Sequence, residues 1–372
     1  MRYTDSESLS HLTKKTGVNE RLKNSTQTLG RKLLPVSYPM ITTYTQHAHL
    51  LSILTHYDCA HPWIFSNYIQ LFINKDYKHH WGDFYFPVTY ELRPSDSCKW
   101  ITSQKIHRDT VTTKWDSFTH FIIENINANH YVHTMINYFY VPLSDRYNKL
   151  QLHHDIFVYG YDLDREILYV SDFFKNGVYS QAEISFTDFN LAFDMNHLTT
   201  NHDYLREMVY LYTFNDQYQD KFSADTLVNS IRNYFTNKTP EYWEMFNYGG
   251  DRHNLDFGMQ IYTTLFNYAK ETSEHKAMLD IRPFHLLYDH KKIMTLRLKY
   301  LYDNRHLIEL NQEHIDEFTA IELKAKILVN LAIKYNLTRD TSISENLQTL
   351  ITNIENEESI FLERWLKKVG SQ

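Results

Sequence analysis

The sequence predicts an α+β domain followed by a helical domain. Between residues 84 and 190, the chain carries several short segments that are rich in aromatic and β-branched residues, which is typical of strands. After about residue 196, apolar residues recur at helical spacing instead. We therefore expect a polar lead-in over residues 1–34, an α+β domain over 35–200 and a helical domain over 201–372.

Composition narrows the class of protein. The chain has 372 residues, of which 42% are hydrophobic and 22% charged, so it can bury a sizeable core. With 38 Lys and Arg against 45 Asp and Glu, the formal net charge is 38 − 45 = −7, and a dedicated nucleic-acid binder is not expected. No apolar run reaches the ~20 residues of a membrane span, and the first residues do not resemble a secretory signal. We expect no nucleic-acid and no membrane partner.

Two further counts concern compartment and cofactors. Only two cysteines are present, which excludes a disulfide framework and a four-cysteine zinc site and indicates the reducing cytoplasm. The chain has nine glycines, and neither GxGxxG nor GxxxxGK[ST] occurs, so a phosphate-binding glycine loop is not expected. The sequence implies no organic cofactor.

The first elements follow from polarity and proline. The lead-in holds seven Lys and Arg against three acidic residues, and Pro35 and Pro39 mark the entry into the folded body. Residues 45–74 have a helical pattern, and the segment 59–73 is apolar on nearly every face, which predicts a buried helix. Because proline is tolerated only in the first turn, Pro62 requires that helix to begin near Asp58 or Cys59.

The remaining elements follow from their periodicity. We expect strands at 84–90, 131–141, 156–161 and 167–170, with a hairpin tip at 162–165 and a helix near 115–125. A helix over 225–235 would be capped by Ser223, and further helices are expected at 291–302 and 347–368. One more helix is indicated by a packing stripe of residues at i, i+4 and i+7 spacing: Ile321, Ala325, Leu328, Ala332 and Tyr335.

Three residues together predict a catalytic triad. A cysteine at a helix start is favoured as a thiolate, and Cys59 has that position. His154 opens a strand-like run, and Asp172 ends the next strand, where antiparallel pairing would bring it beside His154. A thiolate, an imidazole base and a carboxylate that orients the base are the groups needed for acyl transfer through a thioester.

Each of these residues also has a structural interpretation. Cys59 could be a small buried hydrophobe, and Asp172 could cap a strand end. We interpret Cys98 as a loop thiol, while His153 would face the opposite side of the strand from His154. The 21 histidines also allow the alternative hypothesis of a zinc site, and the candidate ligand pairs are His79-His80, His130-x-x-His133 and His56-x-x-Cys59. None of them forms HExxH, and an HxxH on a strand points its rings to opposite faces.

The spacing of these residues resembles two related families. In papain-like peptidases of the bacteriocin-processing type, a glycine follows the base histidine by six residues and a hairpin leads to the aspartate. This chain has His154, Gly160 and Asp172. The butirosin biosynthesis protein H family has an Asp-x-Tyr-x-x-Pro-like strand end, a Tyr, then His and Val-x-Gly-Tyr-Asp. The matching residues are 137–142 (NYFYVP), Tyr147, His154 and 158–162 (VYGYD).

This resemblance, which covers residues 45–195, implies a papain-like fold and a reaction. Members of the butirosin family resemble cysteine peptidases but act as acyltransferases, and closthioamide-type amide-forming enzymes have a similar role. The chain would then move an acyl group from an acyl or peptidyl carrier protein, through Cys59, to a small amine acceptor. Two positions depart from the pattern: Asn137 replaces an acid, and Ile53 stands where papain keeps its oxyanion-hole glutamine. The second oxyanion donor would come from Thr55, His56, Tyr57 or Gln46.

Two alternatives keep part of this interpretation. A peptidase or thioesterase would use the same triad and hydrolyse the acyl-enzyme, because the acceptor depends on the shape of the groove. A non-catalytic papain-like protein would bind a natural product or a carrier protein without any reaction.

Overall fold

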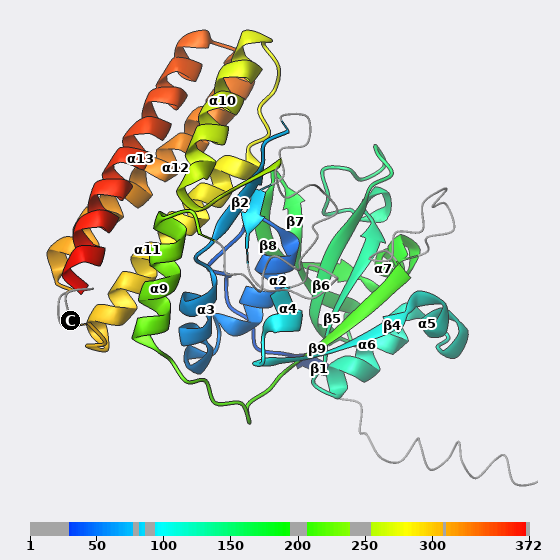
Figure 1. Cartoon of the computed structure of the whole chain (residues 1–372). Coiled ribbons are helices and arrows are strands. Elements are labelled where there is room, and N and C mark those ends of the chain that lie inside the picture. Colours follow the sequence, from blue (N-terminus) through cyan, green and yellow to red (C-terminus); the bar gives the residue numbers. More distant parts are fainter. Residues whose placement is uncertain are drawn as a thin grey trace, which may run out of the picture. The chain divides into compact units, whose positions relative to one another are not determined.

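The computed structural model describes residues 30–76, 82–85, 94–193, 207–238, 254–307 and 310–369. It confirms an α+β protein with an antiparallel sheet and a helical C-terminal region (Figure 1). The chain forms two compact units, each built from several segments. Of the described residues, the first contains 30–34, 105–171, 181–193 and 207–211, and the second contains 35–76, 82–85, 94–104, 172–180, 212–238, 254–307 and 310–369. The predicted domains 35–200 and 201–372 stay a prediction.

The larger sheet has the strand order β4-β9-β5-β6-β7-β8, with β1 paired to β6. Its strands are β1 (Arg31–Leu33), β4 (Ile101–His107), β5 (Tyr131–Asn137), β6 (His153–Asp162), β7 (Ile167–Lys175), β8 (Val178–Ser185) and β9 (Met208–Phe214). Within the first unit, β6 pairs antiparallel with β5, β7 and β1. The predicted strands at 156–161 and 167–170 fall in this sheet, as does the first part (131–137) of the strand predicted at 131–141, and the turn after Asp162 closes the predicted hairpin.

Three short helices accompany this sheet in the chain: α5 (Arg108–Lys114), α6 (Phe118–Asn127) and α7 (Phe186–Phe193). Their aromatic residues pack on one another, as the ring of Phe118 stacks on Phe193 with centroids 3.4 Å apart. Arg108 is buried over the Phe193 ring and donates hydrogen bonds to the carbonyl oxygens of Met135 and Phe193. This buried guanidinium ties α5, β5 and α7 together.

In the described chain, the second unit contains three helices that precede most of the larger sheet in sequence and five that follow it. They are α2 (Thr45–Leu54), α3 (His61–Asn67), α4 (Pro94–Ser97), α9 (Ala224–Phe235), α10 (Ile261–Glu274), α11 (Arg282–Asp303), α12 (Gln312–Thr338) and α13 (Thr341–Val369). A small sheet of order β10-β2-β3 joins Leu255–Phe257, Leu71–Asn74 and Gly82–Phe84. Figure 1 shows α12 and α13 side by side among the C-terminal helices.

Several helix predictions are confirmed by this unit. Ser223 caps α9, because its side chain accepts a hydrogen bond from the backbone N–H of Thr226 at 3.2 Å. Every member of the predicted packing stripe on α12 is buried. The helices expected at 291–302 and 347–368 are the longer α11 and α13. In the first unit, the helix expected near 115–125 is α6.

Three predictions were wrong. The apolar segment 59–73 is not one helix, because α3 ends at Asn67 and Leu71–Asn74 is the strand β2, which pairs with β3 and β10. The segment 208–214 (MVYLYTF), in the part predicted to be helical, is the strand β9. The predicted strand 131–141 ends at Asn137, where a 3-10 turn over Tyr138–Tyr140 begins. Of the predicted strand 84–90, Phe84 lies in β3, and residues 86–90 lie outside the described residues.

Candidate functional site

Cys59 lies in a 3-10 turn (Asp58–Ala60) between α2 and α3, and its side chain is exposed. Pro62 is the second residue of α3, so the helical backbone begins where the proline rule predicts. The imidazole of His61 closes this turn, because its Nε2 lies 3.0 Å from the carbonyl oxygen of Thr55. The carboxylate of Asp58 is 99% exposed and lies 3.8 Å from His61 Nδ1.

The two thiols differ in environment. Cys98 is buried, and burial raises the pKa of its thiol to about 12. The thiolate is the nucleophilic form of cysteine, so Cys98 is inert at neutral pH. Since the chain has two cysteines, Cys59 is the thiol that solvent and reagents can reach.

The residues considered as oxyanion donors have different partners. Gln46 Nε2 donates to Asp83 Oδ2 at 3.1 Å, and His56 Nδ1 lies 3.2 Å from Ser37 Oγ. The Tyr57 ring stacks on Phe214 with centroids 3.7 Å apart. Thr55 Oγ1 is buried and has no hydrogen-bond partner among the described residues. Neither the Thr55 nor the Tyr57 hydroxyl makes a hydrogen bond among the described residues, whereas the Gln46 amide and the His56 imidazole do.

His154 lies near the start of β6 in the first unit and is half-buried. Its Nδ1 lies 3.1 Å from the carbonyl oxygen of Asp155, and its ring is 4.9 Å from that of Tyr138. In the β5–β6 register, His154 stands opposite Ile136 and His153 stands opposite Asn137. Adjacent residues on a strand face opposite sides, so the two histidines have different surroundings.

Gly160 has a structural reason to follow His154 by six residues. It lies in β6 directly opposite Leu33 of β1, next to a register shift between Val158 and Gly160. A Cβ atom at Gly160 would lie 2.7 Å from the carbonyl oxygen of Lys32, so a side chain would push β1 away. The glycine of the family spacing is therefore required here by strand pairing.

Asn137, the position where the family usually has an acid, caps a turn. It is buried, and its side-chain oxygen accepts a hydrogen bond from the backbone N–H of Phe139 at 3.0 Å. Its amide nitrogen donates to the side chain of Gln151. This side chain thus ends β5 and holds the segment that leads to His154.

Asp172 is fully buried in β7. His154 belongs to the first unit, whereas Cys59 and Asp172 belong to the second. The Cys59–His154–Asp172 triad stays a prediction.

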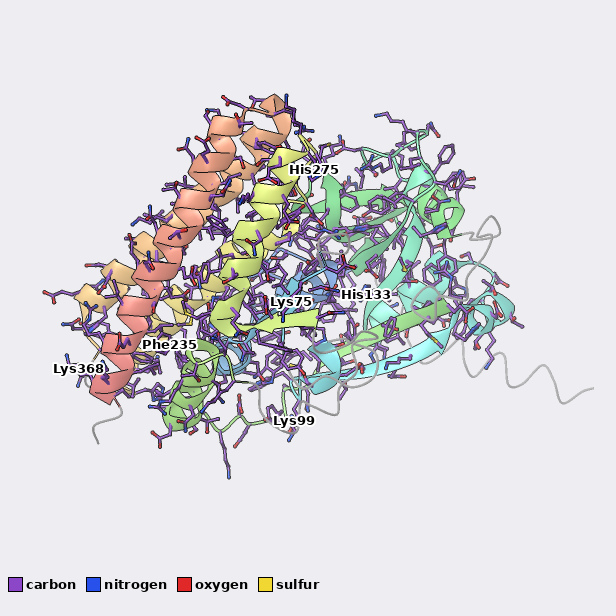
Figure 2. All side chains as sticks on the ribbon, turned by 45° about the horizontal axis from the view of Figure 1, so that its top comes forward. Lys75, Lys99, His133, Phe235, His275 and Lys368 are labelled. Atoms are coloured by element: carbon purple, nitrogen blue, oxygen red, sulfur yellow. The ribbon has the colours of Figure 1, made fainter. Side chains whose placement is uncertain are left out.

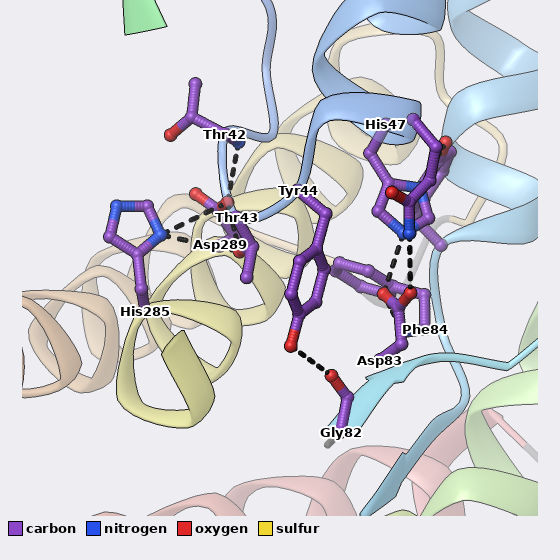
Figure 3. Close-up of polar contacts among 11 residues, drawn as sticks. Thr42, Thr43, Tyr44, His47, Gly82, Asp83, Phe84, His285 and Asp289 are labelled. Atoms are coloured by element: carbon purple, nitrogen blue, oxygen red, sulfur yellow. Dashed lines mark hydrogen bonds and ion pairs between the residues drawn. The ribbon is translucent and has the colours of Figure 1, made fainter. Parts of the chain in front are cut away.

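Among the described residues, three histidine–carboxylate pairs with a buried member were missed by the sequence analysis. His133, labelled in Figure 2, is buried on β5, and its Nε2 lies 2.8 Å from Asp155 Oδ1. In the second unit, His47 Nε2 lies 2.7 Å from Asp83 Oδ1 (Figure 3). His133 and Asp155 are diagonal neighbours in the β5–β6 register, which the sequence alone does not reveal.

The third pair, His285 with Asp289, lies on α11 beside residues 42–43. Asp289 is fully buried on α11, and its Oδ2 accepts hydrogen bonds from the backbone N–H of Thr42 and the hydroxyl of Thr43, both at 2.7 Å (Figure 3). His285 Nδ1 lies 3.5 Å from the same oxygen. Burial lowers the pKa of His285, but the hydrogen bond and charge of Asp289 outweigh it and the net pKa is raised. The pair anchors residues 42–43 to α11.

The metal candidates were also compared with the structure. Within the described ranges, no group of three or more His, Cys, Asp or Glu side chains is arranged to hold a metal ion. His79 and His80 lie outside the described residues.

None of the described helices is both long and apolar enough to cross a membrane.

We compared the chain with known proteins. No protein-family model matches the sequence, and no curated protein matches it either.

Proposed function

We propose that this protein is a papain-like, cysteine-dependent N-acyltransferase of the cytoplasm with Cys59 as its nucleophile. The observation that carries the proposal is the contrast between the two thiols. Cys59 is exposed in the turn that leads into α3, whereas Cys98 is buried with a pKa of about 12. The spacing of His154, Gly160 and Asp172 supports acyl transfer as the reaction.

The proposed reaction has two steps. The Cys59 thiolate attacks the carbonyl carbon of a carrier-protein thioester, and the carrier leaves as a thiol after taking a proton from the His154 imidazolium. A small amine then attacks the resulting Cys59 thioester, loses a proton to His154 and releases Cys59 together with an amide. In this scheme Asp172 orients His154, and the oxyanion is bound by the Cys59 backbone N–H together with a second donor from Thr55, His56, Tyr57 or Gln46.

Alkylation tests the nucleophile first. Wild type, Cys59→Ala and His154→Ala are treated with iodoacetamide at mildly acidic pH and followed by intact mass. We expect one fast label in wild type, none in Cys59→Ala, and labelling about tenfold or more slower in His154→Ala, because the base stabilises the thiolate. The matched control is His153→Ala, which changes the neighbouring imidazole and should label like wild type.

The second assay separates transfer from hydrolysis. Acetyl-pantetheine is incubated with the protein, with and without ethylenediamine, and the products are identified by mass spectrometry. N-acetylethylenediamine that forms only with intact Cys59 supports acyl transfer. Acetate as the sole product would make the protein a thioesterase. Unchanged thioester, together with a Cys59 that labels no faster than a free thiol, would overturn the proposal in favour of a binding protein.

A further inference from the structure

Helix α12 has two apolar faces. One faces the core through the buried packing stripe that includes Ile321, Leu328 and Tyr335. On the opposite face, four large apolar side chains are exposed to solvent: Leu323 by 55%, Ile327 by 50%, Ile333 by 41% and Leu337 by 81%. Single exposed apolar residues are normal, but four along one helix face form a patch that indicates a binding surface.

The exposed face is symmetric about one polar residue. Asn330, also exposed, lies at its centre, with an isoleucine three residues away and a leucine seven residues away on each side. We call Leu323, Ile327, Asn330, Ile333 and Leu337 the α12 stripe. At 1.5 Å per residue, its ends are about 21 Å apart.

The neighbouring helix α13 also carries an exposed apolar side chain. Ile360 of α13 is 61% exposed. Two ion pairs, Lys324 with Glu357 and Arg364 with Glu317, join α12 and α13 on either side of it in sequence. The pairs show that the two helices run antiparallel, so Ile360 lies at about the same height along α12 as the Leu323 end of the α12 stripe.

We propose that the protein forms a two-fold symmetric homodimer in which the α12 stripes of two copies pair antiparallel, with Asn330 at the symmetry axis. A two-fold interface must be self-complementary, and the symmetric spacing of the stripe satisfies this condition. Leu323 then packs against the partner's Leu337, while the amide of Asn330 donates to and accepts from the partner's Asn330. A polar residue at one core position of a helix pair is a known means of fixing register.

The dimer should be weak. One helix from each copy gives an interface at the small end of the known range, and the dissociation constant should be on the order of 10–100 μM. Lys326 and Lys334, both exposed, flank the stripe at equal distances from Asn330. Their stems can cover apolar surface while their charges stay in water.

Sedimentation velocity of the full chain tests the association. The monomer mass is 44.7 kDa, so the average mass should rise toward 2 × 44.7 = 89.4 kDa as the concentration passes this range. Ile327→Glu with Ile333→Glu should keep the protein monomeric at least tenfold higher in concentration. Met278→Glu, at a position that is 67% exposed outside α12, is the matched control and should dimerise like wild type. A monomer throughout, or a loss of dimer in the control as well, would overturn the proposal.

Cross-linking tests the arrangement. In a Cys59→Ser background, Asn330→Cys should form a disulfide-linked dimer, because that position meets its own copy. Leu323→Cys alone should not, because antiparallel pairing separates the two copies of that position by about 21 Å. A mixture of Leu323→Cys and Leu337→Cys should cross-link. If Leu323→Cys cross-links with itself while Asn330→Cys does not, the antiparallel pairing is refuted.

Discussion

Acid should destabilise the protein through one buried imidazole, His290. It lies on α11 and is fully buried, with the Phe84 and Tyr234 rings 6.2 and 4.7 Å away. Its Nδ1 accepts a hydrogen bond from Lys291 Nζ at 3.1 Å, so the neutral ring donates through Nε2 to the carbonyl oxygen of Ile69 at 2.8 Å. A proton on Nδ1 would place N–H against the ammonium of Lys291.

The direction in which pH changes the stability follows from the pKa of His290. Burial, and then the positive charges of Lys291 and Arg297, hold the pKa of His290 well below 6.5. Below pH 6.5 the unfolded chain binds a proton that the folded chain does not, so this contribution to stability is present above 6.5 and is lost as the pH falls. One such group changes the free energy of unfolding by about 1.4 kcal/mol per pH unit, or roughly 2 kcal/mol between pH 6.5 and 5.

Urea unfolding of wild type and His290→Gln across this window measures that contribution. Glutamine keeps one donor for Ile69 and one acceptor for Lys291 but does not titrate. The two curves of unfolding free energy against pH should therefore converge toward acid, with slopes that differ by about one proton. Parallel curves would refute the reasoning, because His290 would then titrate alike in the folded and unfolded chains.

A second histidine serves as the control with opposite sign. The pKa of His285 is raised in the folded chain, since Asp289 outweighs the effect of burial. Its contribution is present below pH 6.5 and is lost as the pH rises through the folded pKa. His285→Gln should therefore change the slope above pH 6.5, in the direction opposite to the change that His290→Gln makes below pH 6.5.

Three further predictions concern other buried groups. Gly160→Ala places a Cβ 2.7 Å from a main-chain oxygen of β1. In urea unfolding, this variant should lower the free energy of unfolding by about 1–3 kcal/mol. An unchanged unfolding midpoint would show that β1 moves freely. In wild type, the Glu358 carboxylate lies 2.5 Å from Lys291 Nζ, and Lys291→Met leaves it buried without its cation. This variant should lower the free energy of unfolding by about 3–5 kcal/mol, more than the double variant Lys291→Met with Glu358→Leu. A single variant that is more stable than the double variant would contradict this. In Cys59→Ala, Cys98 should react with a thiol reagent only after denaturant is added, and labelling of the native protein would show that it is accessible.

Local patterns predicted the elements that depend on neighbouring residues. Ser223 caps α9 because a hydroxyl there reaches the first backbone N–H groups, and the packing stripe from Ile321 to Tyr335 is buried because its period matches a helix. Pro62 located the turn that carries Cys59 for the same kind of reason. These are interactions within one or two turns of chain, and the sequence contains them completely.

Pairings between distant segments were decided by the tertiary structure. The apolar residues 71–73 suit a buried helix and a buried strand equally, and they became a strand because β3 and Leu255–Phe257 lie along their edges. The joining of His133 to Asp155 depends on a register that a shift of one residue would destroy. Likewise, Lys291 meets Glu358 only because α11 and α13 come together in the fold. The sequence by itself determined where α9 begins and that Cys59 lies at the turn before α3, since those are local steric and hydrogen-bonding effects. The tertiary structure decided which charges and imidazoles meet, since that depends on contacts between residues far apart in the chain.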